Sequence, residues 1–226
     1  MFRYRENGAI GAGAREPNYL ILTTYCGQVI SDSIPWRDEL LRVADRLKQK
    51  SRQKRWTERS SFIVERDLMT SAYAIRRLLE AQKVSSKTYS TTVPVIRHTA
   101  TDIVPDMWNR HELEHLYDLE SSTKTQLSLR KYCNQLIHSY VLQISADEED
   151  GLFDGVFVAS EKDCREQVFF IPVKSMIDIC IKIGSEDIWG VNLRRDSTGA
   201  AYWVSFTREE IEAERSAQTQ SDSDSF

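Results

Sequence analysis

The sequence lacks several features that would point directly to a function. Its four cysteines are scattered and include no C-x-x-C pair, so neither a zinc knuckle nor a disulfide framework is indicated. No run approaches the roughly 18 apolar residues of a membrane span, and the opening residues lack the apolar core of a signal peptide. The net charge of -4 gives no overall sign of a nucleic-acid binder. These absences predict a soluble, cytoplasmic protein with reduced thiols and no membrane contact.

The two ends of the chain are polar and carry few packing signals. Residues 1–17 are rich in glycine, but no strand precedes the GAIGAG run and no Gly-Lys-Ser/Thr follows it, so a flexible arm is predicted rather than a phosphate loop. Residues 19–30 are β-branched and aromatic, which favours a strand or an extended segment, although no pairing partner is evident. The charged and serine-rich residues 207–226 predict a disordered tail.

Two long helices are expected in the first third of the chain. Ser33 precedes Ile34 and Pro35, which is a typical helix start because proline has no N–H to leave unsatisfied in the first turn. Apolar residues at helical spacing carry this helix to about residue 50. Thr57 offers a second start, for a helix that reaches about residue 82. The short connection predicts that the two helices pack as an antiparallel pair.

The middle of the chain predicts a further, central helix. Residues 129–144, LRKYCNQLIHSYVLQI, place apolar side chains at the i, i+3, i+4, i+7 spacing of an amphipathic helix. Between the helix pair and this segment, residues 84–106 are rich in serine and threonine and contain two prolines, which predicts a loop. A short helix is expected over residues 108–119.

After an acidic run at residues 147–150 the pattern becomes that of strands. Two hairpins around a short helix stopped by Gly184 are expected, in the order 155–160, 167–173, 174–183, 188–195 and 200–206. The predicted fold class is therefore α+β, a mainly α-helical bundle with a C-terminal antiparallel β-sheet unit. The predicted divisions are an arm (1–17), a helical bundle (18–146), a small α+β unit (150–206) and a tail (207–226).

Three polar residues on the central segment form the first candidate site. Arg130, Asn134 and His138 are spaced by four residues, so on a helix their side chains lie along one line of its polar flank. An imidazole can exchange a proton with a ribose 2′-OH or a leaving oxygen, and a guanidinium can hold the phosphate. The pattern fits metal-independent RNA cleavage, with His138 as acid and base, Arg130 as phosphate clamp and Asn134 as the orienting group. Surface polar residues of an ordinary helix are the alternative interpretation.

The Asn134-x-x-x-His138 pattern, late in an expected helical bundle, resembles the HEPN (higher eukaryotes and prokaryotes nucleotide-binding) group. The resemblance spans roughly residues 34–145. It implies a ribonuclease site on the last long helix, a homodimer in which two such helices face each other, and a setting in toxin-antitoxin or phage-defence systems. The group commonly places its arginine just before the polar position; here that position is Cys133, and the nearest upstream arginine is Arg130.

A second constellation formally matches the zinc-binding pattern H-E-x-x-H. On a helix His111 and His115 would share one zinc ion, and Glu112 would activate a metal-bound water. No third ligand is evident, and charged residues crowd the segment. A chance match on a surface helix is therefore preferred, no metal or cofactor is predicted, and a zinc-dependent peptidase is kept as a minor alternative.

A basic segment offers a candidate RNA contact. Residues 46–59 contain seven lysines or arginines and one acid, and they include a tryptophan on which a base could stack. A solvated connection between helices explains the segment equally well. The predicted RNA-binding residues are Arg46, Lys48, Lys50, Arg52, Lys54, Arg55 and Trp56.

The leading functional hypothesis is a HEPN-like, homodimeric protein that binds RNA or acts as a metal-independent endoribonuclease. The alternative from a different class is a noncatalytic, dimeric interaction module whose C-terminal β unit binds a protein partner. RNA cleavage that depends on His138 would separate the two hypotheses.

Overall fold

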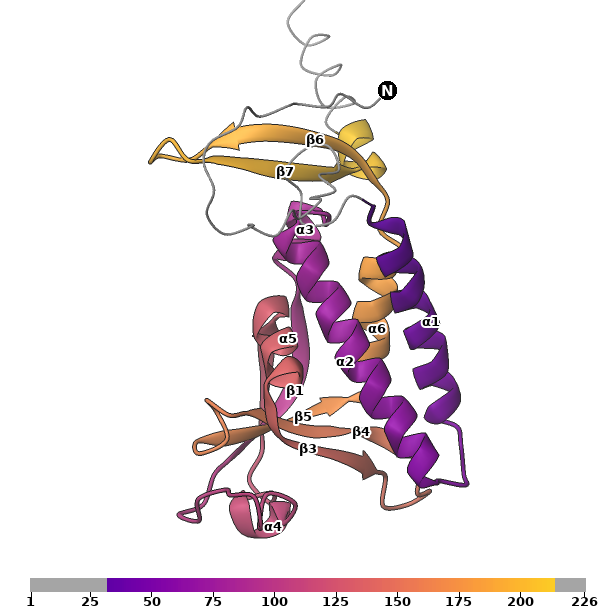
Figure 1. Ribbon diagram of the computed structural model, residues 1–226, viewed down its shortest axis with the longest axis vertical. Helices are drawn as coiled ribbons and strands as arrows, with labels where there is room; N and C mark the ends of the chain where they lie inside the picture. The colour runs from indigo at the N-terminus through magenta and orange to yellow at the C-terminus, as the bar shows by residue number, and fades with distance from the viewer. Residues whose placement is uncertain (1–31, 214–226) are drawn as a thin grey trace, which may run out of the picture.

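A computed structural model describes residues 32–213 (Figure 1). The predicted arm, the segment 19–30 and the last part of the predicted tail lie outside these residues. The described strands form a five-stranded sheet and a separate two-stranded hairpin. Figure 1 shows the large sheet at one end, the hairpin at the other, and long helices running between them. The labelled helices are α1 (Ile34–Lys50), α2 (Glu58–Glu80), α3 (Ser86–Tyr89), α4 (Leu113–Leu116), α5 (Leu129–Ile137) and α6 (Val173–Gly184). Residues 208–213, in the first part of the predicted tail, are also helical. The strands are β1 (Thr92–Thr99), β2 (Thr123–Ser128), β3 (Ser139–Ala146), β4 (Phe153–Ser160), β5 (Gln167–Pro172), β6 (Ile188–Arg195) and β7 (Ala201–Thr207).

Local signals in the sequence position the first two helices. Pro35 lies in the first turn of α1, and the Thr57 hydroxyl accepts a hydrogen bond from the Ser60 amide at 3.3 Å to cap α2. The two helices run in opposite directions and pack together, and α1 also packs along α6 while α2 packs on α5 (Figure 1). The predicted pair of long helices, with both start signals, is confirmed.

The large sheet is antiparallel throughout, in the order β2-β1-β5-β4-β3. Helices α5 and α6 pack on one face of it, and α1 and α2 form a further layer behind them. The segment that contains α4 covers part of the opposite face, where Leu116 and Tyr117 pack against residues of β3, β4 and β5. The Tyr117 hydroxyl donates a hydrogen bond to the Cys164 carbonyl at 2.8 Å, which fixes this cover to the turn after β4.

The predicted fold class, a mainly α-helical bundle with an appended β unit, is wrong, because the chain is mixed and its main sheet lies at the centre of the sequence. The expected helix over residues 129–144 ends at Ile137. His138 leaves the helical conformation at φ -109° and ψ 29°, and residues 139–146 form β3, paired with β4. SYVLQISA has β-branched and aromatic residues that suit either a helix face or a strand, and pairing with β4 decides between them.

The expected loop over residues 84–106 contains β1. Val93 and Val95 are buried and alternate with exposed neighbours, which is the period of a strand. Pro94 made this segment resemble a loop, but its missing N–H removes no ladder bond on the β5 side, because β5 pairs with β1 only from Ile96 onward. The expected helix over 108–119 is reduced to the four residues of α4.

The C-terminal hairpins and the helix between them are confirmed: β4 pairs with β5, α6 follows, and β6 pairs with β7. The large sheet nevertheless crosses the boundary predicted near residue 150. It joins β3 to β4, and β1 to β5, so all five strands between residues 92 and 172 belong to one sheet. The N-terminal helices and the C-terminal helix α6 pack over the same apolar core.

Replacing Tyr132 with phenylalanine should raise the free energy of unfolding by about 1 kcal/mol. Tyr132 lies on α5 with none of its surface exposed, and its hydroxyl has no hydrogen-bond partner among the described residues. Burial also holds the pKa of this hydroxyl well above its usual value. The change removes an unsatisfied polar group and keeps the ring. Urea denaturation measures the effect, and Tyr117→Phe is the matched control, because it loses a hydrogen bond and should lower stability instead. A loss of stability in Tyr132→Phe would contradict the prediction.

Candidate functional site

A polar cleft lies where α5 ends against the turn between β4 and β5, with a volume of about 600 Å³. We call it the His138 cleft. Four of its residues come from α5 and its C-terminal cap, and four from the end of β4 and the following turn. They are Lys131, Asn134, Gln135, His138, Ser160, Glu161, Lys162 and Asp163.

Buried hydrogen bonds fix the floor of this cleft. Gln135 is 1% exposed, and its side-chain oxygen accepts a hydrogen bond from the Ser160 amide at 2.8 Å while its NH₂ group donates to the Asp163 carboxylate. The Glu161 amide donates to the carbonyl of His138 at 3.1 Å, which fastens the turn to the end of α5. The cleft is therefore held in one shape before any ligand binds.

The cleft carries an unpaired imidazole and two ammonium groups. The His138 side chain is exposed and makes no hydrogen bond or ion pair within the described residues. Lys131 lies over the Phe169 ring, with Nζ 5.2 Å from the ring centroid and 4.0 Å from the Asp163 carboxylate. Lys162 is exposed on the opposite wall. The cleft therefore places two ammonium groups and the carboxylates of Glu161 and Asp163 beside one unpaired imidazole.

Asn134 has an arginine partner, but not the one that the sequence suggested. Arg76 of α2 donates from Nη1 to the Asn134 side-chain oxygen at 2.8 Å, and its Nε donates to Glu80 at 2.9 Å. Arg130 is exposed one turn before Asn134 and does not line the cleft. The structure therefore brings Asn134 and His138 together and places Arg130 outside.

Sequence reasoning missed Lys131, Lys162 and Arg76. Lys131 precedes Asn134 by three residues and His138 by seven, so the helical spacing that selected those two could have found it. Arg76 lies 58 residues before Asn134, and only the packing of α2 on α5 brings them together. Lys162 depends in the same way on the fold of the β4–β5 turn.

The H-E-x-x-H residues do not share a helical face. Helix α4 spans only Leu113–Leu116, so Glu112 caps the helix and His111 precedes it. Both imidazoles are exposed beside Glu112, at 3.9 Å for His111 and 3.4 Å for His115. Within residues 32–213 no three histidine, cysteine, aspartate or glutamate side chains are placed to hold a metal ion. The geometry of a zinc peptidase is not formed here.

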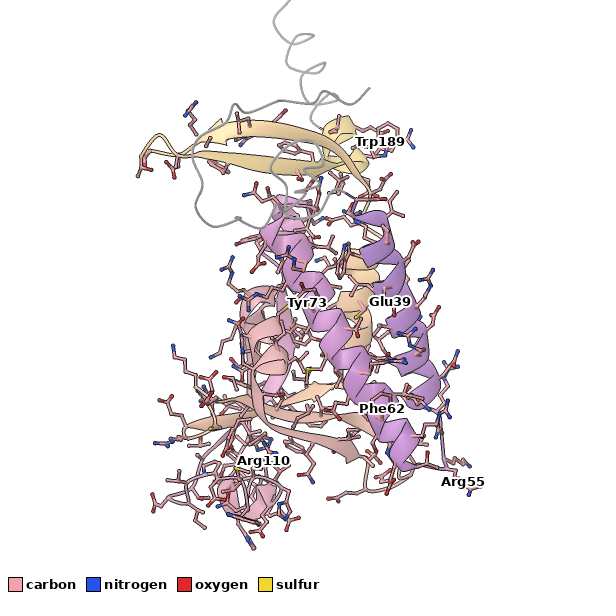
Figure 2. All side chains as sticks on the ribbon, in the orientation of Figure 1. Glu39, Arg55, Phe62, Tyr73, Arg110 and Trp189 are labelled. Carbon is pink, nitrogen blue, oxygen red and sulfur yellow. The ribbon has the colours of Figure 1, made fainter. Side chains whose placement is uncertain are left out.

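The basic segment forms the turn between α1 and α2, where Arg55 is labelled in Figure 2. Arg46 is held by hydrogen bonds to Asp67 and Glu39, both at 2.7 Å, and these bonds raise the pKa of its guanidinium. Trp56 donates to the Ser61 hydroxyl at 2.8 Å, and its ring packs against Phe153 with centroids 5.6 Å apart. These two residues support the fold.

The remaining residues of that segment divide into two groups. Lys48 contacts Asp45 at 3.4 Å and Lys50 donates to Gln53 at 2.7 Å, so both have intramolecular partners. The other three are exposed and stay candidates for an RNA contact: Arg52, Lys54 and Arg55.

A larger groove, of about 760 Å³, follows the free edge of β3, and we call it the β3 groove. One wall comes from the start of α2, with Ser61 and Glu65, and the other from Arg110 and His111. The Arg110 guanidinium lies 5.6 Å from the centroid of the Tyr140 ring, at the beginning of β3. The lining of this groove combines the ionisable side chains of Glu65, Arg110 and His111 with apolar residues of β3 and with Phe153.

The chain matches no known protein family, and neither curated proteins nor solved structures include one with significant similarity to it. Within the described part of the chain, no helix is both long and apolar enough to cross a membrane.

Proposed function

We propose that this protein binds RNA at the His138 cleft and cleaves it without a metal ion. The observation that carries the proposal is the unpaired imidazole of His138 in one rigid cleft with the ammonium groups of Lys131 and Lys162. Lysine and histidine are suited to a phosphodiester, because ammonium groups hold the phosphate while the imidazole moves the proton. In this proposal the two lysines, rather than Arg130, contact the phosphate.

The reaction needs one proton transfer from the attacking 2′ oxygen and one to the leaving 5′ oxygen. His138 accepts the proton of a ribose 2′-OH, the 2′ oxygen bonds to phosphorus, and the bond from phosphorus to the 5′ oxygen breaks. The leaving oxygen takes a proton from solvent or from His138, which yields a 2′,3′-cyclic phosphate and a 5′-hydroxyl. Lys131 and Lys162 stabilise the added charge on the phosphate oxygens. Asn134, oriented by Arg76, is the hydrogen-bonding group beside the ribose.

A cytoplasmic location belongs to the same proposal. Cys133 and Cys180 are buried free thiols, and burial raises the pKa of each to about 12, so both stay protonated and unreactive. Unpaired thiols fit a reducing compartment. A role in phage defence or a toxin-antitoxin pair is a further hypothesis, which rests on the sequence resemblance alone.

His138→Ala should lower the rate of RNA cleavage by about 100- to 10,000-fold, because it removes the group that accepts the proton. The measurement uses 5′-labelled single-stranded RNA of mixed sequence in excess EDTA. Thermal unfolding should be unchanged, since the side chain is exposed. His111→Ala is the matched control, an exposed histidine outside the cleft, and it should keep full activity. A parent protein that does not cleave, or a His138→Ala variant that cleaves normally, would exclude the proposed reaction.

The Lys131→Ala/Lys162→Ala double variant should weaken RNA binding by roughly tenfold at low salt, because two phosphate contacts are lost. Arg130→Ala should leave the affinity nearly unchanged, since Arg130 does not line the cleft. Fluorescence anisotropy with the same RNA measures both. If Arg130→Ala weakened RNA binding more than the double lysine variant did, Arg130 rather than the two lysines would be the phosphate contact.

A further inference from the structure

The free edge of β3 is unusually unprotected. Within residues 32–213, β3 pairs with β4 alone, and its eight residues, SYVLQISA, include no charge and no proline. Irregular pairing is confined to its two ends, between Ser139 and Val141 and between Ser145 and Ala146. Edge strands are normally shielded by charge, proline or short length, because a bare edge is a template for another strand. The opposite edge strand, β2, carries Lys124. We therefore expect this long, uncharged edge strand to pair with a strand of another molecule.

An apolar loop directly precedes Arg110, which lines the groove at this edge. Ile103, Val104, Met107 and Trp108 are exposed, at 50%, 54%, 76% and 85%, and we call these four residues the apolar knuckle. The loop is ordered, because the Asp106 carboxylate accepts hydrogen bonds from the amides of Trp108 and Asn109 at 2.7 and 2.9 Å. Aromatic residues and methionine held in one conformation bind a partner with little loss of entropy.

The apolar knuckle does not fill the β3 groove of its own chain, because Met107 and Trp108 stay exposed and do not line the groove. Arg110, two residues after Trp108, already forms a wall of the groove over Tyr140. Figure 2 shows Arg110 near the α4 end of the sheet and Phe62 on α2, toward the other end of the sheet. The groove volume of about 760 Å³ is ample for an indole and a thioether from a second molecule. A protrusion beside a recess is the arrangement that two copies can satisfy reciprocally about a two-fold axis.

Charge selects the orientation of such a pair. The beginning of β3 lies beside Arg110 and His138, and its end leads into the acidic turn Asp147, Glu148, Glu149 and Asp150. Antiparallel pairing of β3 with a second β3 sets the basic beginning of each strand against the acidic turn of the other. An unrelated extended segment has no reason to match this distribution, whereas a second copy matches it automatically.

We propose that two copies of this chain pair antiparallel through β3, with each knuckle packed in the β3 groove of the other copy. The two sheets then form one continuous sheet across the two-fold axis. The knuckle is essential, because one short strand buries much less than the roughly 800 Å² per partner of a stable interface. The proposal is independent of the RNA chemistry proposed above, so either can fail alone.

The test is sedimentation velocity of the full chain over about 1 to 100 µM, a range in which a specific dimer is populated. The parent should sediment with twice the chain mass. Gln143→Lys places like charges close together near the centre of the paired strands, and Trp108→Ala removes the largest exposed side chain; each should raise the dissociation constant by at least about tenfold. Raising the salt concentration from about 0.05 to 0.5 M should also weaken the dimer.

Two matched controls separate this interface from general surface effects. Gln126→Lys makes the same change on the opposite edge strand, and Trp189→Ala removes another exposed indole, 58% exposed on β6. Both should leave the dissociation constant unchanged. A monomeric parent at the highest concentration would overturn the proposal. A dimer insensitive to both Gln143→Lys and Trp108→Ala would overturn it as well.

Discussion

Replacing Asp67 with asparagine should lower the free energy of unfolding by about 3 kcal/mol. The Asp67 side chain is 1% exposed and accepts hydrogen bonds from Arg46 at 2.7 Å and from Arg66 at 2.8 Å. Losing one partner of a fully buried pair costs roughly 3 to 5 kcal/mol. The value here lies at the lower end, because both arginines reach solvent and Arg46 keeps Glu39. This carboxylate fastens α1 to α2.

Urea denaturation followed by circular dichroism measures this loss, and Asp178→Asn is the matched control. Asp178 pairs with Lys174 on the surface of α6, with the two side chains 57% and 80% exposed. An exposed pair of this kind contributes at most about 1 kcal/mol. If both substitutions cost the same, the buried pair does not hold the helices together as described.

The elements that the sequence predicted are those with local signals. Proline in the first turn of α1 and the Thr57 cap of α2 act within a few residues of the backbone that they order. The helix predicted over residues 139–146 was wrong because their apolar spacing suits a helix and a strand alike. The choice is made by β4, which begins only after an intervening turn and supplies the partners of β3. Nonlocal pairing of this kind is invisible to a periodicity argument.

The candidate site follows the same division. Asn134 lies on α5 and His138 is the residue that caps its C-terminus, so the four-residue spacing still brought the two into one cleft. Arg46 could not be recognised as a structural residue, because its partner Asp67 is 21 residues away on another helix. Trp56 resembled a stacking platform until the fold placed it on Phe153. Charged and aromatic residues in a sequence are candidates for ligand contacts. Their partners in the folded chain decide which of these side chains are free to bind a ligand.

Replacing Gly155 with valine should lower the free energy of unfolding by about 3 kcal/mol, the upper end of the usual cost of overpacking. Gly155 lies on β4, and a Cβ atom there would sit 2.6 Å from both the Ile171 carbonyl oxygen and Cζ of Phe170. The Phe170 ring covers this glycine and packs on Phe157, with centroids 5.0 Å apart. The Ile171 oxygen belongs to the backbone of β5, so it cannot move without disturbing the pairing of β4 with β5.

A double variant distinguishes the two sources of this strain. Phe170→Ala, added to Gly155→Val, removes the ring but leaves the carbonyl oxygen, so it should recover only part of the lost stability. Gly199→Ala is the control. Nothing lies within 4 Å of a Cβ atom there, and its φ of +84° alone should cost about 1 kcal/mol. Urea denaturation measures the loss of stability in both variants. Equal losses at Gly155 and Gly199 would contradict the prediction, because they would mean that β4 and β5 move apart to accommodate the valine. The pairing of these two strands joins β3 to the rest of the sheet, so its rigidity also decides how firmly the edge proposed for dimerisation is held.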